Sequence, residues 1–159
     1  MISSLNNKKE YLLVLTDFKK NSQCAANFAL NLAFRLKCNI LLFNSWFNPV
    51  TNFENFPNRS LNILAQKSKE ELGKELKRLE AVMEGATTTT GFKPKLICLQ
   101  GEGALCDNIL HILSLNDVIM VILGGRKKNN DDLLFGLEIN SILTHVPIPA
   151  VVVPEFEDF

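Results

Sequence analysis

The residues that come nearest to a known chemistry lie in GGRKKNNDDLLFGLEI, from Gly124 to Ile139, directly after the apolar run Val118–Leu123. A glycine turn between a strand and a helix often holds phosphate, because the first N–H groups of the helix have no partner within it. Arg126, Lys127 and Lys128 add three positive charges at the same turn. The stretch is therefore a candidate site for a nucleotide or another anion, and the alternative is that the three cations are solvated loop charges neutralised by Asp131 and Asp132.

A second glycine turn, GEGALC from Gly101 to Cys106, partly matches the G-x-G-x-x-G fingerprint of dinucleotide-binding proteins. Cys106 stands where the third glycine of that fingerprint lets the helix pack closely on the strand. No clear acidic partner follows, and the chain has no P-loop pattern. We interpret this stretch as a simple strand-to-helix turn.

No arrangement of side chains indicates an enzyme. Asp107 and His111 are one helical turn apart, but no serine or cysteine stands at a nucleophile turn such as G-x-S-x-G. His145 is better explained as a partner for the negative end of a helix, and Asp131 with Asp132 as caps at a helix start. We predict no catalytic residue and no metal site.

Composition limits the classes of partner. The chain has 159 residues, enough for one domain, and 17 basic residues balance 17 acidic ones. Without a net positive field, we expect neither nucleic acid nor a membrane surface as a partner. No apolar run approaches the length of a membrane span, and the N-terminus lacks the pattern of a signal peptide, so we expect a cytoplasmic protein.

The cysteines agree with a reducing compartment. Cys24, Cys38, Cys98 and Cys106 form neither a CxxC pair nor a metal-ligand spacing. We expect all four to be small, buried, apolar residues rather than disulfide partners.

Apolar runs and helical spacings alternate along the chain. This alternation predicts an α/β fold in which a five-stranded parallel sheet carries helices on both faces. It forms one domain over residues 11–154, between tails at 1–10 and 155–159. The expected strands are 11–15, 39–43, 95–99, 118–123 and 150–153, and the expected helices are 22–37, 61–83, 104–115 and 133–144.

The stretch 44–60 shows neither the helical nor the strand period of apolar residues and is predicted to be a long connection. Its aromatic-rich part, Trp46 to Phe56, has three interpretations: a lid or stacking surface for a ligand, a surface for a partner protein, or a flap packed on its own core. The sequence does not choose among them.

Ligands of open parallel sheets bind outside the carboxyl ends of the strands, where the chain order reverses. Four turns of this chain are predicted to lie there. They are Thr16–Asp17, Asn44–Ser45, Gly101–Gly103 and Gly124–Arg126.

Three landmarks together resemble the universal stress protein family over Tyr11 to Pro154. They are Asp17 at the end of the first strand, the segment from Asp117 to Arg126, and the glycine-headed helix and P-x-P strand from Gly136 to Val153. The resemblance implies a five-stranded parallel α/β sandwich. It also implies a cytoplasmic homodimer made through the last strand, which comprises Ala150, Val151, Val152 and Val153.

In members of that family that bind ATP, the fourth strand is followed by G-x2-G-x9-G-[S/T]. Counted from Gly124, the second glycine is replaced by Lys127, the third comes one residue early at Gly136, and Leu137 replaces the hydroxyl. A lysine at a glycine position and a lost hydrogen bond to phosphate together cost about 2.5 to 5 kcal/mol. Asp17, which the resemblance places facing the nucleotide, is present.

The favoured hypothesis is a non-catalytic dimer of the stress response that acts by protein contacts, with a decayed nucleotide site and no bound cofactor. The alternative is a sensor that binds ATP, another nucleotide or a different anion. Under either hypothesis, the candidate nucleotide-contacting residues are Asp17, Gly124, Arg126, Lys127 and Gly136. A slow nucleotide hydrolase ranks last, because Asp17 is its only candidate catalytic group.

Overall fold

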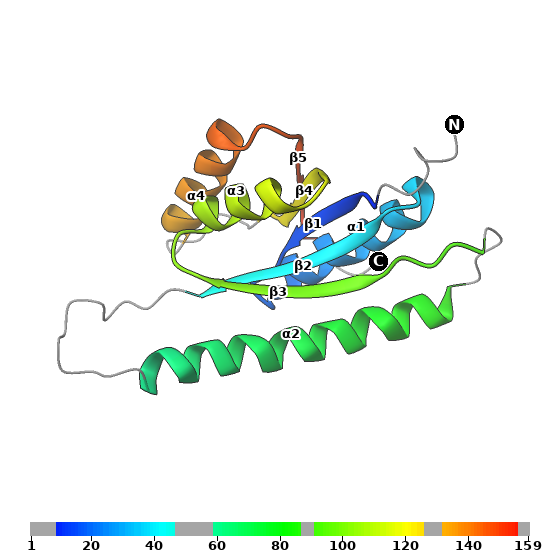
Figure 1. Ribbon diagram of the computed structural model, residues 1–159, viewed down its shortest axis with the longest axis horizontal. Helices are drawn as coiled ribbons and strands as arrows, with labels where there is room; N and C mark the ends of the chain where they lie inside the picture. Colours follow the sequence, from blue (N-terminus) through cyan, green and yellow to red (C-terminus); the bar gives the residue numbers. More distant parts are fainter. Residues whose placement is uncertain (1–8, 47–58, 87–90, 126–131, 156–159) are drawn as a thin grey trace.

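The computed structural model describes residues 9–46, 59–86, 91–125 and 132–155. Strands and helices alternate throughout these ranges (Figure 1). The strands are β1 (Tyr11–Leu15), β2 (Asn39–Trp46), β3 (Leu96–Glu102), β4 (Val118–Gly124) and β5 (Ala150–Val153), and the helices are α1 (Lys20–Leu36), α2 (Arg59–Gly85), α3 (Leu105–Leu115) and α4 (Asp132–His145).

The five strands form one parallel sheet in the order β3-β2-β1-β4-β5. The chain leaves β1 toward β2 and β3, and then crosses back to add β4 and β5 on the other side of β1. The order therefore reverses between β1 and β4, which is where open α/β sheets place their ligands. The predicted fold class is confirmed.

Each face of the sheet has its own apolar core. Leu12, Val14 and Ile40 face α1 and α2, whereas Leu13 and Leu41 face α3 and α4. All five side chains are buried, which explains why the strands show no polar alternation in the sequence. Figure 1 shows α2 along one face and α3 with α4 across the other.

Helix α1 approaches the sheet closely because its inner face consists of small residues. Ala25, Ala29 and Ala33 are fully buried against it. The helix ends at Lys37, whose left-handed backbone (φ 54°) directs its N–H to the carbonyl of Ala33. It begins at Lys20, two residues earlier than predicted, because the chain is extended only as far as Lys19.

Helix α2 is held to α1 by Arg78. Its guanidinium Nε lies 2.9 Å from Oε2 of Glu75 on the same helix, and its Nη1 lies 2.8 Å from Oδ1 of Asn27 on α1. Buried Glu75 thus holds the Arg78 side chain, which clamps α2 to α1 through its bond to Asn27. On the outer face, Lys74 pairs with Glu71 at 3.3 Å.

The other boundaries lie within two residues of the prediction, but β2 and β3 each end three residues later than predicted. Strand β2 extends past Phe43 to Trp46, because Asn44–Trp46 continue to pair with Gln100–Glu102 of β3. The same pairing places Gly101 inside a strand rather than in a turn. The connection predicted over 44–60 thus begins later, and its part from 47 to 58 lies outside the described residues.

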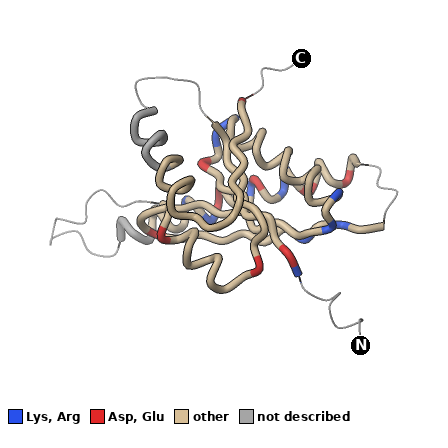
Figure 2. The backbone as a smooth tube through the Cα atoms, turned by 90° about the horizontal axis from the view of Figure 1, so that it is seen from above, with Lys and Arg blue, Asp and Glu red and all other residues tan. Residues whose placement is uncertain are grey.

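Acidic and basic residues are interspersed along the described backbone (Figure 2), in keeping with the equal totals of the two signs. None of the helices in the described ranges combines the length and the apolarity that a membrane-spanning segment needs.

Candidate ligand-binding site

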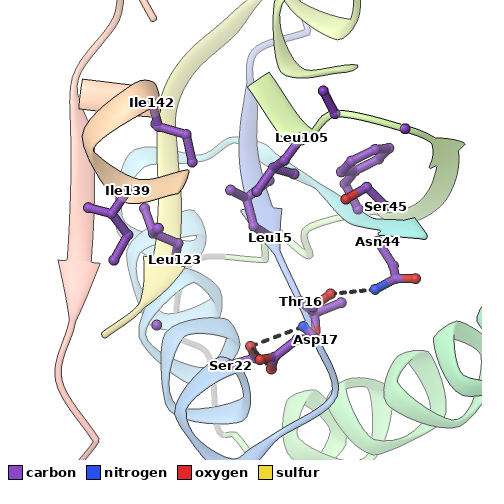
Figure 3. A pocket seen from close by; sticks show the side chains of 14 residues that line it. Leu15, Thr16, Asp17, Ser22, Asn44, Ser45, Leu105, Leu123, Ile139 and Ile142 are labelled. Carbon is purple, nitrogen blue, oxygen red and sulfur yellow. Dashed lines mark hydrogen bonds between the residues drawn. The ribbon is translucent and has the colours of Figure 1, made fainter. Parts of the chain in front are cut away.

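A pocket of about 410 Å³ opens at the carboxyl ends of β1, β2 and β4, where the strand order reverses. Its volume is within the range of small-molecule sites, roughly 300 to 1,000 Å³. Apolar side chains form most of its wall, and polar groups gather along one side (Figure 3). The lining consists of Leu15, Thr16, Asp17, Ser22, Phe43, Asn44, Ser45, Gly103, Ala104, Leu105, Leu123, Gly124, Ile139 and Ile142.

Asp17 lies at the polar side of this pocket, directly after β1. Its Oδ1 accepts hydrogen bonds from the Ser22 hydroxyl at 2.6 Å and from the Lys19 backbone N–H at 3.0 Å. The backbone N–H of Asp17 in turn donates to Ser22 Oγ at 3.1 Å. A carboxylate at the start of α1 also interacts favourably with the positive end of that helix. Asp17 therefore borders the pocket near the carboxyl end of β1, and Ser22 of α1 fixes its orientation.

The turn between β1 and α1 passes through Phe18, whose φ of 67° lies in the left-handed region. For a bulky residue this conformation costs about 1 to 2 kcal/mol. The Phe18 N–H donates to Oγ1 of Thr16 at 3.0 Å, which helps to hold the turn. This backbone strain lies beside the pocket, as strain often does at binding sites.

Asn44 bridges the ends of β1 and β2. The last backbone bond between these strands joins the Thr16 N–H to the Phe43 carbonyl at 2.9 Å. One residue further along β2, the Asn44 side-chain nitrogen donates to the Thr16 carbonyl at 2.7 Å. Its side-chain oxygen accepts from the Ser68 hydroxyl on α2, also at 2.7 Å. The polar wall of the pocket is therefore connected to α2.

Gly124, at the end of β4, lies against the first turn of α1. A Cβ added to it would lie 2.5 Å from the carbonyl oxygen of Asn21 and 3.0 Å from the nitrogen of Ser22. Such distances leave no room for any side chain. Gly124 is thus required by packing, whether or not a phosphate binds beside it.

Two glycines shape the opposite wall. Gly103 adopts a φ of 94° between β3 and α3, a conformation that favours glycine. A Cβ on Gly101 would meet the side chain of Asn108, which donates to the carbonyls of Glu102 at 3.0 Å and Ala104 at 2.9 Å. The interpretation of GEGALC as a strand-to-helix turn therefore holds for Gly103, whereas Gly101 makes room for the Asn108 side chain of α3.

The structure brings two of the five predicted contact residues, Asp17 and Gly124, to one pocket. Arg126 and Lys127 lie outside the described residues, and Gly136 is placed only as a member of α4. Of the four predicted turns, each contributes at least one residue to the lining. His145 is at the end of α4 as expected, with Nδ1 2.9 Å from the Ser141 carbonyl oxygen.

Sequence reasoning missed the role of Ser22 as the partner of Asp17, and it missed Ser68. A signal for Ser68 existed, because it lies four residues from both Leu64 and Leu72 and so shares the apolar stripe of α2. Ser68 is 4 % exposed. A lone serine in a buried stripe needs a hydrogen-bond partner, and here that partner is Asn44.

The four cysteines are free thiols, and none of them is part of the described pocket lining. Only Cys38 is buried, so the prediction of four buried cysteines is wrong for the three that are partly exposed. Burial, together with the charge of Glu10, raises the pKa of the Cys38 thiol, and burial together with Glu80 raises the pKa of Cys98. Within the described ranges, no cluster of three or more His, Cys, Asp or Glu is arranged to hold a metal ion.

Comparison with solved structures supports the fold across nearly the whole chain. UspA from Lactobacillus plantarum matches with 18 % identity and a TM-score of 0.63, covering 93 % of this chain and 99 % of that one. A universal stress protein in complex with cAMP matches with 14 % identity and a TM-score of 0.63, covering 94 % and 100 %. One from Archaeoglobus fulgidus in complex with dAMP matches with 12 % identity and a TM-score of 0.58, covering 92 % and 97 %.

No curated sequence matches the chain. The model of the universal stress protein family, however, matches residues 10–154, which is nearly the whole chain and one residue more than the span of the resemblance in the sequence. The chain therefore belongs to the universal stress protein family.

Proposed function

We propose that this protein is a non-catalytic homodimer. It binds a nucleoside or a nucleoside monophosphate, and it binds the terminal phosphates of ATP only weakly. The observation that carries the proposal is the pocket of about 410 Å³ at the point where the strand order reverses. The pocket has an apolar wall, which suits the flat ring of such a ligand, and a polar side with Asp17, which suits its sugar.

The apolar wall suits the base of such a ligand. Leu15, Phe43 and Leu105 line the pocket and offer contact surface without a hydrogen-bonding demand. Two related universal stress proteins were solved with cAMP and with dAMP, and both of these ligands carry one phosphate. These complexes support the ligand class, whereas the residues of this chain set the expected affinity.

The phosphate end is where this chain departs from ATP-binding members. Lys127 stands at a glycine position of their motif and Leu137 at the hydroxyl position. The loss of the glycine conformation and of the hydroxyl hydrogen bond together lowers the affinity for phosphate by roughly a hundred- to several-thousand-fold. Weaker phosphate binding by this loop lowers the affinity for a triphosphate more than the affinity for a nucleoside, because a nucleoside has no phosphate to contact the loop.

The same proposal includes the dimer through β5 and a cytoplasmic location. The four free thiols are compatible with a reducing compartment. No step of the proposal requires a catalytic group, and we assign none.

The test uses the purified full chain. We would denature it and chromatograph the supernatant for nucleotides, and then titrate adenosine, AMP, cAMP and ATP-Mg by calorimetry. We expect adenosine or AMP to bind, and ATP to bind no more than about tenfold more tightly than AMP, a difference of about 1.4 kcal/mol. Stoichiometric ATP in the supernatant, or an ATP dissociation constant below about 10 μM, would contradict the decayed triphosphate site.

A pair of variants localises the binding. Ala104 is exposed at the mouth of the pocket, so Ala104→Trp should block the pocket without disturbing the core. Ala86 is also exposed but follows α2, so Ala86→Trp is the matched control. Binding of AMP should be lost in the first variant and kept in the second. Equal affinities in both would place the ligand elsewhere.

A second candidate function is action by protein contacts alone. It is favoured by three leucines that stay exposed on the α3 and α4 side, namely Leu110, Leu115 and Leu143, with exposed fractions of 39 %, 70 % and 56 %. Under this candidate, none of the four nucleosides and nucleotides would bind at millimolar concentration. The ligand titration therefore separates the two functions.

A further inference from the structure

Ser68 is a buried hydroxyl inside the apolar face of α2, and none of the described side chains of this helix lines the pocket. Its Oγ donates to Asn44 Oδ1 at 2.7 Å. Asn44 does line the pocket, and its Nδ2 donates to the Thr16 carbonyl at 2.7 Å. A continuous chain of hydrogen bonds thus runs from α2 through β2 to the end of β1 (Figure 3 shows the bond between Asn44 and Thr16).

The two bonds fix which way the Asn44 amide points. The Thr16 carbonyl can only accept, so it selects the nitrogen of the amide. The Ser68 hydroxyl donates to the oxygen at the other end. A rotated amide would set its oxygen against the Thr16 carbonyl oxygen, which is repulsive. Without Ser68, the buried amide oxygen would lose its partner and the amide its second anchor.

We propose that Ser68 is a positioning residue for the pocket: it holds Asn44 so that the second N–H of the amide is available to a ligand. An amide nitrogen carries two N–H groups, and one of them is used by Thr16. The pocket then selects a ligand with a hydrogen-bond acceptor facing β2, such as a ring nitrogen or a sugar oxygen. This inference rests on the proposed function, whose ligand class it refines.

The orientation of the Asn44 amide also sets the width of the pocket between the ends of β1 and β2. Beyond Phe43, β2 continues along β3 while the chain after β1 turns away toward α1. The strands separate here, and the Asn44 side chain replaces the next backbone bond between them. Ser68 therefore acts on the spacing of Thr16 and Asn44 from the far side of the sheet.

The test combines NMR with AMP titration on the full-length protein. In Ser68→Ala we expect shifts of the Asn44 side-chain amide signals and of the Thr16 and Asp17 backbone signals. We also expect AMP binding weakened about 2- to 12-fold, the size of one neutral hydrogen bond. Ser68→Thr keeps the hydroxyl and should restore affinity to within about twofold of the wild type.

Two further variants separate positioning from general stability. Leu72→Val alters the same buried face of α2 one turn later, so it should lower stability but leave the Asn44 signals and AMP affinity unchanged. If Ser68 acts through Asn44, the double variant Ser68→Ala with Asn44→Ala should bind AMP no more weakly than Asn44→Ala alone.

Each result decides the inference. Unchanged Asn44 signals in Ser68→Ala, failure of Ser68→Thr to restore affinity, or additive losses in the double variant would overturn it. If the wild type binds neither AMP nor adenosine, the proposed function fails. The Asn44, Thr16 and Asp17 signals then decide by themselves whether Ser68 positions this wall.

Discussion

The end of β4 touches the start of α1 backbone to backbone: a Cβ on Gly124 would lie 2.5 Å from the carbonyl oxygen of Asn21. Gly124→Ala should therefore push α1 away from the sheet and deform the pocket between them. We expect the free energy of unfolding to fall by about 1 to 3 kcal/mol, as in other overpacked sites. Urea denaturation followed by circular dichroism measures this change.

Gly73→Ala is the control for that substitution. Gly73 lies within α2, and a Cβ there would meet nothing within 4 Å. Because alanine favours a helix over glycine, this variant should gain about 0.5 to 1 kcal/mol. Equal effects of the two substitutions would show that close packing does not explain Gly124.

The architecture was predictable because local patterns of apolar residues, namely continuous runs and helical spacings, indicate each strand and helix. Strands β1 and β5 have the predicted bounds, since each is a continuous apolar run ended by polar residues or proline. The end of β2 was not predictable in the same way. Asn44 looks like a loop residue, and only the pairing with β3 keeps it in a strand.

The pocket residues divide in the same way, into those that local patterns predict and those that depend on partners elsewhere in the fold. Asp17 and Gly124 were found because the carboxyl ends of parallel strands meet at one edge. Ser22 and Ser68 depend on side-chain partners that lie 5 and 24 residues away in the sequence. The Ser22–Asp17 pair forms in the turn between β1 and α1, and the Ser68–Asn44 pair forms where β1 and β2 separate, so no periodicity specifies either partner.

The clamp between α1 and α2 predicts an unequal response of two neighbouring ion pairs. Arg78→Met keeps the apolar stem but leaves the buried carboxylate of Glu75 without its cation. Since the Arg78 side chain is itself 29 % exposed, we expect a loss of about 1 to 3 kcal/mol rather than the larger cost of a fully buried pair. Thermal and urea unfolding would both report it.

Lys74→Met is the matched substitution on the outer face of the same helix. Lys74 is 74 % exposed and pairs with Glu71, so its loss should change stability by less than about 0.5 kcal/mol. A loss as large as that of Arg78→Met would mean that the clamp has no special role.

The raised pKa values of Cys38 and Cys98 predict a loss of stability in alkali. Both thiols have a pKa above the ordinary value of 9.0 in the folded protein, so folding favours their neutral form. This contribution is complete below pH 9.0, where the unfolded thiols are also neutral, and it is lost as the pH rises above that value. Urea unfolding at pH 8, 9 and 10 would follow the decline.

Lysine and tyrosine also titrate in alkali, so the comparison needs a variant without the two thiols. Cys38→Ala with Cys98→Ala should be less stable at neutral pH but show a shallower decline above pH 9.0. Parallel declines in the wild type and the variant would show that the thiols do not contribute.

The last prediction concerns the two edges of the sheet. Among the strands that the structure describes, β5 pairs with β4 alone and β3 with β2 alone. The sequence of β5, AVVV, has no charge to discourage another strand, whereas β3 ends in a glutamate. We therefore expect β5 to form the proposed dimer. Val152→Lys should convert the dimer to a monomer in sedimentation experiments.

Ile97→Lys on β3 provides a closely matched control. Val152 is 40 % exposed and Ile97 is 39 % exposed, so the same charge enters an equally accessible site on an edge strand in each case. If β5 is the interface, only the Val152 variant should dissociate. Dissociation of the Ile97 variant alone would move the interface to the opposite edge. A wild type that sediments as a monomer at every concentration would exclude a dimer through either edge.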